Sequence, residues 1–409
     1  MPSELVELKG HIIDSLSLPR VLDSILAQGG EFEILEMTVG KTRDDQSRAL
    51  IRIQAPNDDK LNAVLAYIEQ EGANRLEQQD AELVPAPKDG VFPEHFYCTT
   101  NLPTSVKVSG KWIPVDRVEM DCGIVIENGQ ARTTPMNDVR AGQMVVVGHD
   151  GIKVETPERR ESVGTFEFMT STVSSEKPKA LMVAEVARQI RDTKKAGKKV
   201  LLVGGPAIVH AGAGEAVARM IRDGWIDVIF AGNALATHDI ESALYGTALG
   251  VYIEEGKPAP HGHENHLRAI NEIRRVGSIA EAVKQGVLTK GIMYEAVKAG
   301  VSYVLAGSIR DDGPLPDVIT DVMEAQDAMR AQLSEVGMAL MVATTLHSVA
   351  TGNLLPASVE VVCVDINTAV VTKLADRGTH QAVGVVTDAA LFMSELADEL
   401  KEAGPWRAS

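Results

Sequence analysis

Over the second half of the chain, short runs of almost uninterrupted aliphatic residues alternate with amphipathic stretches. Strands that are apolar on both faces occur almost only in parallel sheets whose two faces are covered by helices. The pattern therefore predicts an α/β domain over residues 165–409, built on one parallel sheet. The expected strands are residues 198–205, 226–232, 302–308, 339–344, 359–366 and 382–388, and the expected helices are residues 179–197, 213–224, 264–277, 289–300 and 318–336.

Two smaller domains are expected before this sheet. Residues 1–84 follow the order strand, helix, strand, strand, helix and a further strand, which is typical of a small ferredoxin-like α+β domain. Residues 85–164 lack a helical period and consist of short β-type runs separated by Gly, Asn and Asp turns. We expect a compact β-rich domain there, of barrel-like character.

Composition narrows the partners that such a chain can have. The 40 Lys and Arg against 57 Asp and Glu give a formal net charge of −17, which argues against nucleic acid or an anionic membrane as a main partner. The sequence shows no apolar run of transmembrane length and no signal-peptide layout. Three scattered cysteines do not make a disulfide or zinc framework. We expect a cytoplasmic homo-oligomer, a dimer or tetramer, that binds a small molecule.

The stretch VGGPAIVHAGAG (203–214) looks like half of a dinucleotide-binding signature. That signature needs three glycines at a strand-to-helix turn and an acidic residue at the end of the next strand. Val217 occupies the third glycine position, and the next strand ends at residues 231–233 without a carboxylate. The stretch therefore fails as an adenosine site. We expect Gly204 and Gly205 to clear space beside the nicotinamide or substrate, or to let the chain turn.

A better candidate for cofactor binding is the segment 339–367, which reads as strand, polar turn, helix and strand. The turn 344–348 offers hydroxyls and helix N-terminal N–H groups that suit a pyrophosphate. Asp365 ends the second strand, where a carboxylate accepts from ribose hydroxyls and favours NAD over NADP. A turn capped by Asp365 is the alternative. Because parallel strands end at one edge of a sheet, the polar or Gly-rich strand ends should share this crevice. They are residues 204–206, 232–234, 307–308 and 387–388.

Histidines gather in the segment HGHENH and after two of the strands. The cluster consists of His210, His238, His261, His263, Glu264 and His266. It could hold a metal, contact substrate and transfer protons, or provide simple loop polarity. HGHENH lacks the H-x-x-x-H spacing that places two imidazoles on one helix face, so we assign no metal ligand. Imidazoles titrate near pH 7 and suit a reaction that releases an amine.

Seven strings stand out along the chain: GHIIDS, FYCTTNLPTSVKVSGKWIPV, SSEKP, AGNALATHDIE, HGHENHLRAINEIR, GIMYEAVKAGVSYVLAGSIRDDGPLPDV and ATTLHSVATGN. Through them the chain resembles, over nearly its whole length, the NAD-dependent ornithine cyclodeaminases of the archaeal type. These carry a region named after lysine-oxoglutarate reductase/saccharopine dehydrogenase bifunctional enzymes. The same unit is similar to the C-terminal half of cyanobacterial arginine dihydrolase/ornithine cyclodeaminase fusions.

The resemblance implies a function, a cofactor and a site. The implied function is conversion of L-ornithine to L-proline and ammonia with a tightly bound, recycled NAD, in proline biosynthesis and in arginine and ornithine catabolism. The implied fold of the NAD-binding domain is similar to that of deoxyhypusine synthase, which differs from a standard Rossmann domain. The implied NAD-binding positions are Asn233, Ala234, Asp312, Thr344, Thr345, Leu346, His347, Asp365, Thr387 and Asp388.

For catalysis, a substrate with one carboxylate and two amines needs a cation at one end and acids or carbonyls at the other. We expect Lys177 to bind the carboxylate, Asp239 and Glu264 to bind the amines, and His238 or His263 to transfer protons. Further candidates for the same roles are Lys290, Arg310, Asp311 and His347. Surface or capping polarity is the alternative for each. For the whole chain, the alternatives are an NAD-dependent dehydrogenase or deaminase of another amino acid, a non-catalytic NAD- and amino-acid-binding regulator, and a metal hydrolase.

Overall fold

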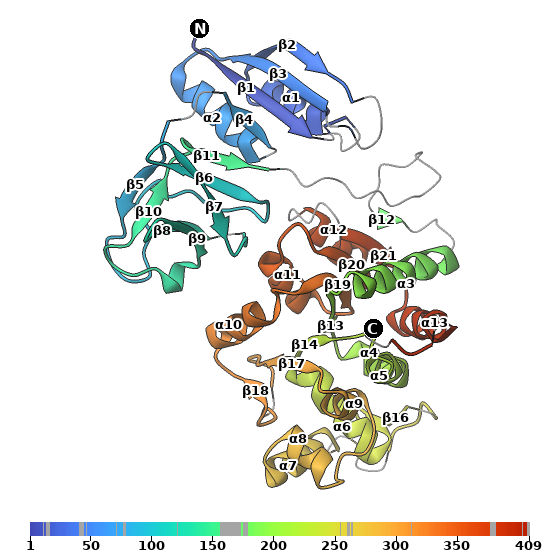
Figure 1. Ribbon diagram of the computed structural model, residues 1–409. Coiled ribbons are helices and arrows are strands. Elements are labelled where there is room, and N and C mark those ends of the chain that lie inside the picture. The colour runs from blue at the N-terminus through green and yellow to red at the C-terminus, as the bar shows by residue number, and fades with distance from the viewer. Residues whose placement is uncertain are drawn as a thin grey trace. The chain divides into compact units, whose positions relative to one another are not determined.

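The structure is a computed structural model, shown in Figure 1, and it divides into two compact units. One unit comprises Met1–Met169 with Leu355–Ala357, and the other comprises Thr170–Leu354 with Ser358–Ser409. The residues described are 1–10, 12–13, 17–40, 45, 47–70, 72–76, 79–120, 122–155, 173–174, 179–253, 255–259, 262, 265–311, 313–376, 382–402 and 404–406. None of the helices within these ranges is long and apolar enough to cross a membrane.

The first unit begins with a four-stranded antiparallel sheet and two helices. Its elements are β1 (Ser3–Gly10), α1 (Ser17–Ala27), β2 (Glu31–Thr38), β3 (Ser47–Gln54), α2 (Asp58–Gln70) and β4 (Ala73–Arg75). The strand order is β2-β3-β1-β4. Alternate residues of β3, including Ile51 and Ile53, are fully buried against the helices. This is the element order and layering expected of the ferredoxin-like domain.

A seven-stranded sheet forms the rest of this unit. Its strands are β5 (Glu82–Pro85), β6 (Thr104–Val108), β7 (Lys111–Asp116), β8 (Gly123–Glu127), β9 (Gln130–Thr134), β10 (Met144–Val147) and β11 (Ile152–Val154), in the order β11-β6-β7-β9-β8-β10-β5. A single turn of 3₁₀-helix, Met136–Asp138, connects β9 and β10. Because β5 pairs with β10, the expected boundary at residue 84 falls inside a strand of this sheet. We propose that the β-rich domain begins before Glu82.

The second unit contains the predicted parallel sheet. Its strands are β12 (Val173–Ser174), β13 (Lys199–Gly204), β14 (Val228–Gly232), β17 (Ser302–Ala306), β18 (Val318–Ile319), β19 (Val336–Val342), β20 (Glu360–Asp365) and β21 (Ala382–Val386), in the order β12-β21-β20-β19-β13-β14-β17-β18. All pairings recorded among these strands are parallel. The central strand β19 is buried along its whole length. The α/β prediction is therefore confirmed.

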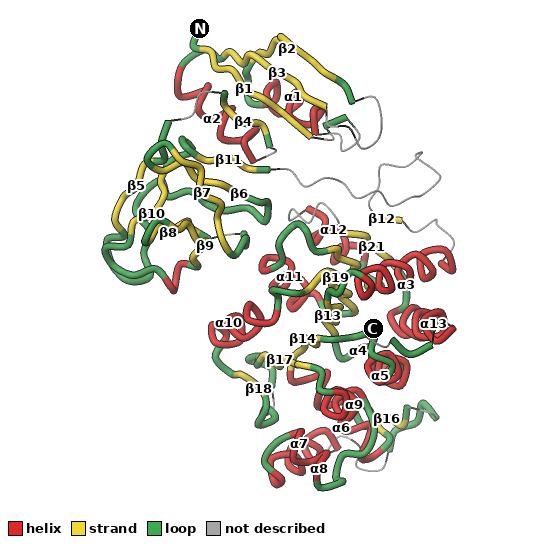
Figure 2. The backbone as a smooth tube through the Cα atoms, in the orientation of Figure 1, coloured by secondary structure: helices red, strands yellow, loops and turns green. Residues whose placement is uncertain are grey.

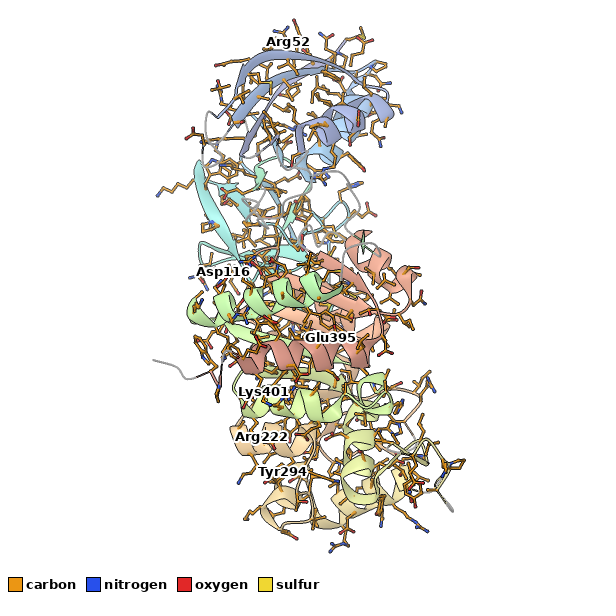
Figure 3. The ribbon with its side chains drawn as sticks, turned by 90° about the vertical axis from the view of Figure 1, so that its right-hand side faces the viewer. Arg52, Asp116, Arg222, Tyr294, Glu395 and Lys401 are labelled. Atoms are coloured by element: carbon orange, nitrogen blue, oxygen red, sulfur yellow. The ribbon has the colours of Figure 1, made fainter. Side chains whose placement is uncertain are left out.

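Helices cover both faces of this sheet, as Figures 1 and 2 show. The helices described in this unit are α3 (Lys179–Lys195), α4 (Ala207–His210), α5 (Gly214–Arg222), α6 (Asn233–Tyr245), α7 (Asn265–Val276), α8 (Ile279–Lys284), α9 (Ile292–Ala299), α10 (Val322–Gln332), α11 (Thr345–Leu354), α12 (Thr368–Asp376) and α13 (Ala389–Glu402). Of these, α7 packs against α6 and α8 packs against α9. On one face α13 packs against α3 and α5, and α5 packs against α9. An ion pair of 2.7 Å between Arg222 and Glu295 joins α5 to α9, and Figure 3 labels Arg222 there. On the other face α11 contacts α12.

Several segments differ from the sequence expectation. The sequence pattern did not predict α4, α6, α8, α12 or α13, nor the small hairpin β15 (Thr247–Ala248) and β16 (Val251–Tyr252) that follows α6. The helix expected over residues 318–336 begins only at Val322, because residues 318–319 pair with β17 and because Asp321 caps the helix. One carboxylate oxygen of Asp321 accepts from the backbone N–H groups of Met323 and Glu324, which satisfies two donors of the first turn.

Candidate functional site

The winding of the parallel sheet changes direction at its carboxyl edge, and this point is called the candidate crevice below. β13 and β19 are neighbours, and their pairing ends at Gly204 and Val342. From β13 the chain winds toward β14 and β17, whereas from β19 it winds the opposite way toward β20 and β21. The connections that follow β13 and β19 therefore lead away from each other at these two strand ends. Ligands of open α/β sheets bind at such points.

The glycines at the end of β13 permit close packing at this point. A methyl group on Gly205 would lie 1.9 Å from the carbonyl oxygen of Ala343, and one on Gly204 would lie 2.7 Å from Cδ1 of Leu235. The N–H of Gly205 also donates to the carbonyl of Val342, at 2.9 Å. The glycine pair therefore brings the ends of two strands together and admits a side chain of α6. It clears space for the protein's own atoms, and it makes no dinucleotide fingerprint.

His347 lies across the crevice from its own strand. A methyl group on Gly232, at the end of β14, would lie 2.9 Å from Nε2 of His347, which is on α11. The imidazole thus covers the end of a strand two positions away in the sheet. Burial lowers the pKa of His347, and the nearby carboxylate of Asp311 only partly opposes this shift. The imidazole of His347 is therefore neutral at neutral pH, and it can donate a hydrogen bond from one nitrogen and accept one at the other.

The ends of β20 and β21 bring acidic and hydroxyl groups to the same edge. Asp365 is half-buried, and one of its carboxylate oxygens accepts from the N–H of Asn367 at 2.8 Å. Thr387, one residue past β21, is 7% exposed, and its Oγ1 has no hydrogen-bond partner among the described residues. Asp388 is exposed and caps α13 by accepting from the N–H of Leu391. Asp365 and Thr387 thus retain hydrogen-bonding capacity for a ligand.

The turn between β19 and α11 completes this edge. Ala343 has a left-handed backbone, with φ of 52°, and it redirects the chain into the turn. Thr345 begins α11 and is exposed, and Leu346 is 74% exposed. The exposed side chain of Leu346 can contact a ring, and the first N–H groups of α11 can bind an anion. Asn233 and Ala234 begin α6, where the carbonyl oxygen of the buried Asn233 amide accepts from the N–H of Leu315.

A buried polar cluster lies on α6, further along the chain from Asn233. Nδ1 of His238 lies 2.9 Å from Oε2 of Glu241, and the carboxylate of Glu241 is fully buried. The ring of His210, at the end of α4, meets the ring of His238 edge-on at 4.6 Å between centroids. The ring of His266, on α7, lies 6.4 Å from that of His238. Three imidazoles from three helices therefore lie together, and one of them, His238, contacts a buried carboxylate.

Asp239, the residue after His238, caps a helix. It is 3% exposed, and its two carboxylate oxygens accept from the backbone N–H groups of Ile292 and Met293, each at 2.8 Å. These N–H groups begin α9, so Asp239 caps that helix from a distance. Gly291 makes room for it, because a methyl group there would lie 2.8 Å from the carboxylate. Both oxygens accept from the backbone, which is the capping alternative stated for this residue, and binding of a substrate amine by Asp239 stays a prediction.

Several expected site residues lie outside the described residues: Lys177, His261, His263, Glu264 and Asp312. Lys290 and Arg310 are described and exposed. Within the described part of the chain, no group of three or more His, Cys, Asp or Glu side chains is placed to hold a metal ion. The sequence pattern did not single out Glu241. A signal for its helix was present, since Gly246, with φ of 70°, ends a helix after a strand.

Family models match consecutive parts of the chain. Residues 3–102 match the LOR/SDH bifunctional enzyme conserved region. Residues 103–183 match the first region of the C-terminal part of ArgZ-like arginine dihydrolases, and residues 184–396 match the Rossmann-fold region of that part.

Named proteins are similar to this chain over most or nearly all of its length. The ornithine cyclodeaminase of Methanothermobacter thermautotrophicus is 55% identical over 405 residues, which are 98% of this chain and 98% of the relative. A crystal structure of a conserved LOR/SDH protein from Methanococcus maripaludis S2 is 52% identical, with a TM-score of 0.75, and covers 80% of this chain and 99% of that one.

A third match is a complex with ligands. The crystal structure of the ternary complex of AgrE with ornithine and NAD⁺ is 41% identical, with a TM-score of 0.54, over 98% of this chain and 58% of that one. AgrE is named as the bifunctional arginine dihydrolase/ornithine cyclodeaminase of Nostoc sp.. The chain therefore belongs to the ornithine cyclodeaminase family, whose sequence also forms part of the arginine dihydrolase/ornithine cyclodeaminase fusions.

Proposed function

We propose that this protein is an NAD-dependent ornithine cyclodeaminase that converts L-ornithine to L-proline and ammonia. The observation that carries the proposal is 55% identity, over 98% of both chains, to a protein named ornithine cyclodeaminase. The complex of AgrE with ornithine and NAD⁺ supports the substrate and the cofactor. The crevice at the carboxyl edge of the parallel sheet is the place in this chain where both would bind.

The residues along the crevice fit a dinucleotide. The Oγ1 of Thr387 lacks a partner among the described residues, and the half-buried carboxylate of Asp365 can accept from ribose hydroxyls. We propose that these two residues hold the adenosine side, that the turn 344–348 holds the phosphates, and that Asn233, Ala234 and His347 lie toward the nicotinamide. Asp312 and Asp388 complete the proposed set. When bound, NAD supplies a reversible two-electron oxidation at the α-carbon of the substrate.

The protein's own contribution is to position the substrate and move protons. Ornithine carries two ammonium groups near neutral pH, and each must lose a proton before its nitrogen can act as a nucleophile or become part of an imine. We propose His238 as the group that accepts and returns this proton, with His263 as a second candidate. Holding the δ-amine close to the α-carbon makes ring closure an intramolecular step of high effective concentration. Lys177 and Glu264 stay proposals for binding the carboxylate and an amine.

The test is an amino-acid panel with the protein as purified. We expect ornithine alone to release ammonia, with one proline formed for each ammonia and no net NADH. A protein that binds NAD but turns over no amino acid is instead a regulator. Accumulation of NADH identifies an ordinary dehydrogenase, and ammonia from another amino acid changes the substrate but not the reaction class.

We also propose a setting for this activity. The named relatives are enzymes of amino-acid metabolism, which supports a cytoplasmic enzyme of proline biosynthesis and of arginine and ornithine catabolism. A homodimer or homotetramer is our proposal for the assembly, and light scattering on the full chain measures it.

A further inference from the structure

We propose that Glu241 is a positioning residue, which holds His238 with its Nδ1 protonated so that Nε2 is the proton acceptor for the substrate. The identity of the substrate rests on the proposed function, whereas the placement of the proton on His238 rests on the contacts of Glu241 alone. The proposal adds to the candidate site a residue that does not itself contact substrate.

Glu241 is surrounded by hydrogen-bond donors. Its Oε2 lies 2.9 Å from Nδ1 of His238 and accepts from the N–H of Leu249 at 3.2 Å. Its Oε1 accepts from Oγ1 of Thr247 at 2.8 Å and from the N–H of Gly250 at 3.1 Å. The side chain is fully buried. Burial raises the pKa of Glu241, but the hydrogen bonds from His238, Gly250 and Thr247 outweigh it and leave the pKa below its usual value. The carboxylate is therefore ionised.

An ionised carboxylate determines which nitrogen of His238 carries the proton. It has acceptors only, so Nδ1 of His238 must donate to it. The neutral imidazole then has its lone pair on Nε2, and a proton that arrives at Nε2 gives an imidazolium stabilised by Glu241. This is the arrangement in which a buried carboxylate orients a general base and stabilises its protonated form.

The surroundings of His238 favour transfer of a proton over a purely structural contact. The titratable groups placed around it are Glu241 on its own helix, His210 on α4 and His266 on α7. Burial and the neighbouring His238 lower the pKa of His210, with Glu241 opposing the shift. Nε2 of His210 is buried and has no partner among the described residues. A packed core leaves few such atoms unpaired, so an unpaired imidazole nitrogen here points to a polar ligand or a water.

The cluster also lies near the proposed site. α6 begins at the carboxyl end of β14, and α4 follows the carboxyl end of β13. His238 follows Asn233 by five residues in α6, which is about 7.5 Å along the helix axis at 1.5 Å per residue. The protons balance over the whole reaction. The two ammonium groups lose one proton each before imine formation and ring closure, and the departing ammonia and the proline nitrogen regain one each. Nε2 of His238 takes the proton of the δ-ammonium, the nitrogen keeps its electron pair for ring closure, and the same proton is returned when ammonia leaves.

The alternative is that Glu241 only anchors the turn at Thr247–Gly250, and two variants separate these roles. Glu241→Gln keeps the size of the side chain and removes the charge that fixes the tautomer. Thr247→Val is the control, because it removes the hydrogen bonds that join Thr247 to Glu241 and to the amide of Asn265, and leaves both the charge and the contact with His238. Both variants are made in the full chain, and melting temperature and NAD affinity are measured first.

Nitrogen-15 NMR of protein labelled at histidine reads the tautomer directly, with His238→Gln to assign the signal. We expect Nδ1–H for His238 in the wild type and in Thr247→Val, and loss of this preference in Glu241→Gln. With ornithine, Glu241→Gln should lower kcat on the order of 10²-fold with a much smaller change in KM.

The outcomes separate the two proposals. A wild-type protein that is inert toward ornithine refutes the proposed function, while the tautomer measurement still decides the role of Glu241. A wild-type His238 protonated on Nε2 overturns the positioning role. So does a Glu241→Gln variant whose tautomer and kcat match the wild type and whose loss is confined to melting temperature, as in Thr247→Val.

Discussion

Replacing Gly205 by alanine tests the packing that creates the crevice. The new methyl group would lie 1.9 Å from the carbonyl oxygen of Ala343 and 2.7 Å from its carbonyl carbon. Ordinary non-bonded contact between heavy atoms is about 3.5 Å, so the ends of β13 and β19 must move apart by roughly 1.5 Å. The obstacle is backbone, which cannot rotate away as a side chain could.

The cost follows from two terms. Overpacking of a well-packed interior costs about 1–3 kcal/mol. Weakening the hydrogen bond from the N–H of Gly205 to Val342 adds about 1 kcal/mol. We therefore expect Gly205→Ala to lose about 2–4 kcal/mol of unfolding free energy. Because Ala343 leads directly into the turn 344–348, we also expect NAD to bind at least about tenfold more weakly, which corresponds to 1.4 kcal/mol.

Urea unfolding and fluorescence titration with NAD measure these two effects. The matched control is Gly214→Ala at the start of α5, where a methyl group meets no atom within 4 Å. That variant should be unchanged or more stable by about 0.4–1 kcal/mol, since alanine restricts the unfolded chain. If Gly205→Ala unfolds like the control and binds NAD like the wild type, the two strand ends are not as tightly packed as argued.

Three further changes test other parts of the site. Asp365→Ala should weaken NAD binding roughly 10- to 100-fold through loss of a charge-assisted hydrogen bond. Its control is Asp321→Ala, which removes the cap of α10 and should cost about 1 kcal/mol of stability with an unchanged affinity for NAD. Equal affinities in the two variants would contradict the ribose assignment. Burial raises the pKa of Asp239 to about 6 from 3.8, so its contribution to stability is full below pH 3.8 and is lost as the pH rises through 6. About 1.4 kcal/mol of unfolding free energy should disappear between pH 5 and pH 7.5, and Asp239→Asn should lack this step in urea titrations at the two pH values. Gly232→Ala should displace the ring of His347, from which its methyl group would be 2.9 Å, and weaken NAD binding without a matching loss of stability; an unchanged affinity would place His347 away from the cofactor.

The sequence predicted the helices that bury one face and the short strands that are buried on both faces. β13 and β19 are aliphatic throughout, and their parallel pairing brings Gly204 and Val342 to the edge where the crevice was expected. The helix α6 escaped prediction because it is buried almost all round, with Thr237, His238 and Asp239 buried as well as its apolar residues. Such a helix shows no apolar stripe with a polar opposite face.

The roles of individual polar residues were harder to predict than their positions. Asp239 and Glu241 are both acidic residues in the same helix, yet one caps α9 and the other contacts His238. The difference depends on which elements pack beside each side chain. Those elements are distant in sequence for Asp239 and form a hairpin too short to leave a periodic pattern for Glu241. Tertiary contacts decide such roles, and local spacing carries no signal of them.

The order of the strands in the parallel sheet also has a consequence for how the protein is made. β13 pairs with β19, which lies about 140 residues later in the chain, and β12 pairs with the last strand, β21. The two sides of the crevice therefore come together only after almost the entire chain has left the ribosome, whereas the N-terminal sheet can form early during synthesis. A chain that stalls or is cut before β19 has no crevice. Retention of NAD should consequently report that synthesis and folding of the second unit have been completed.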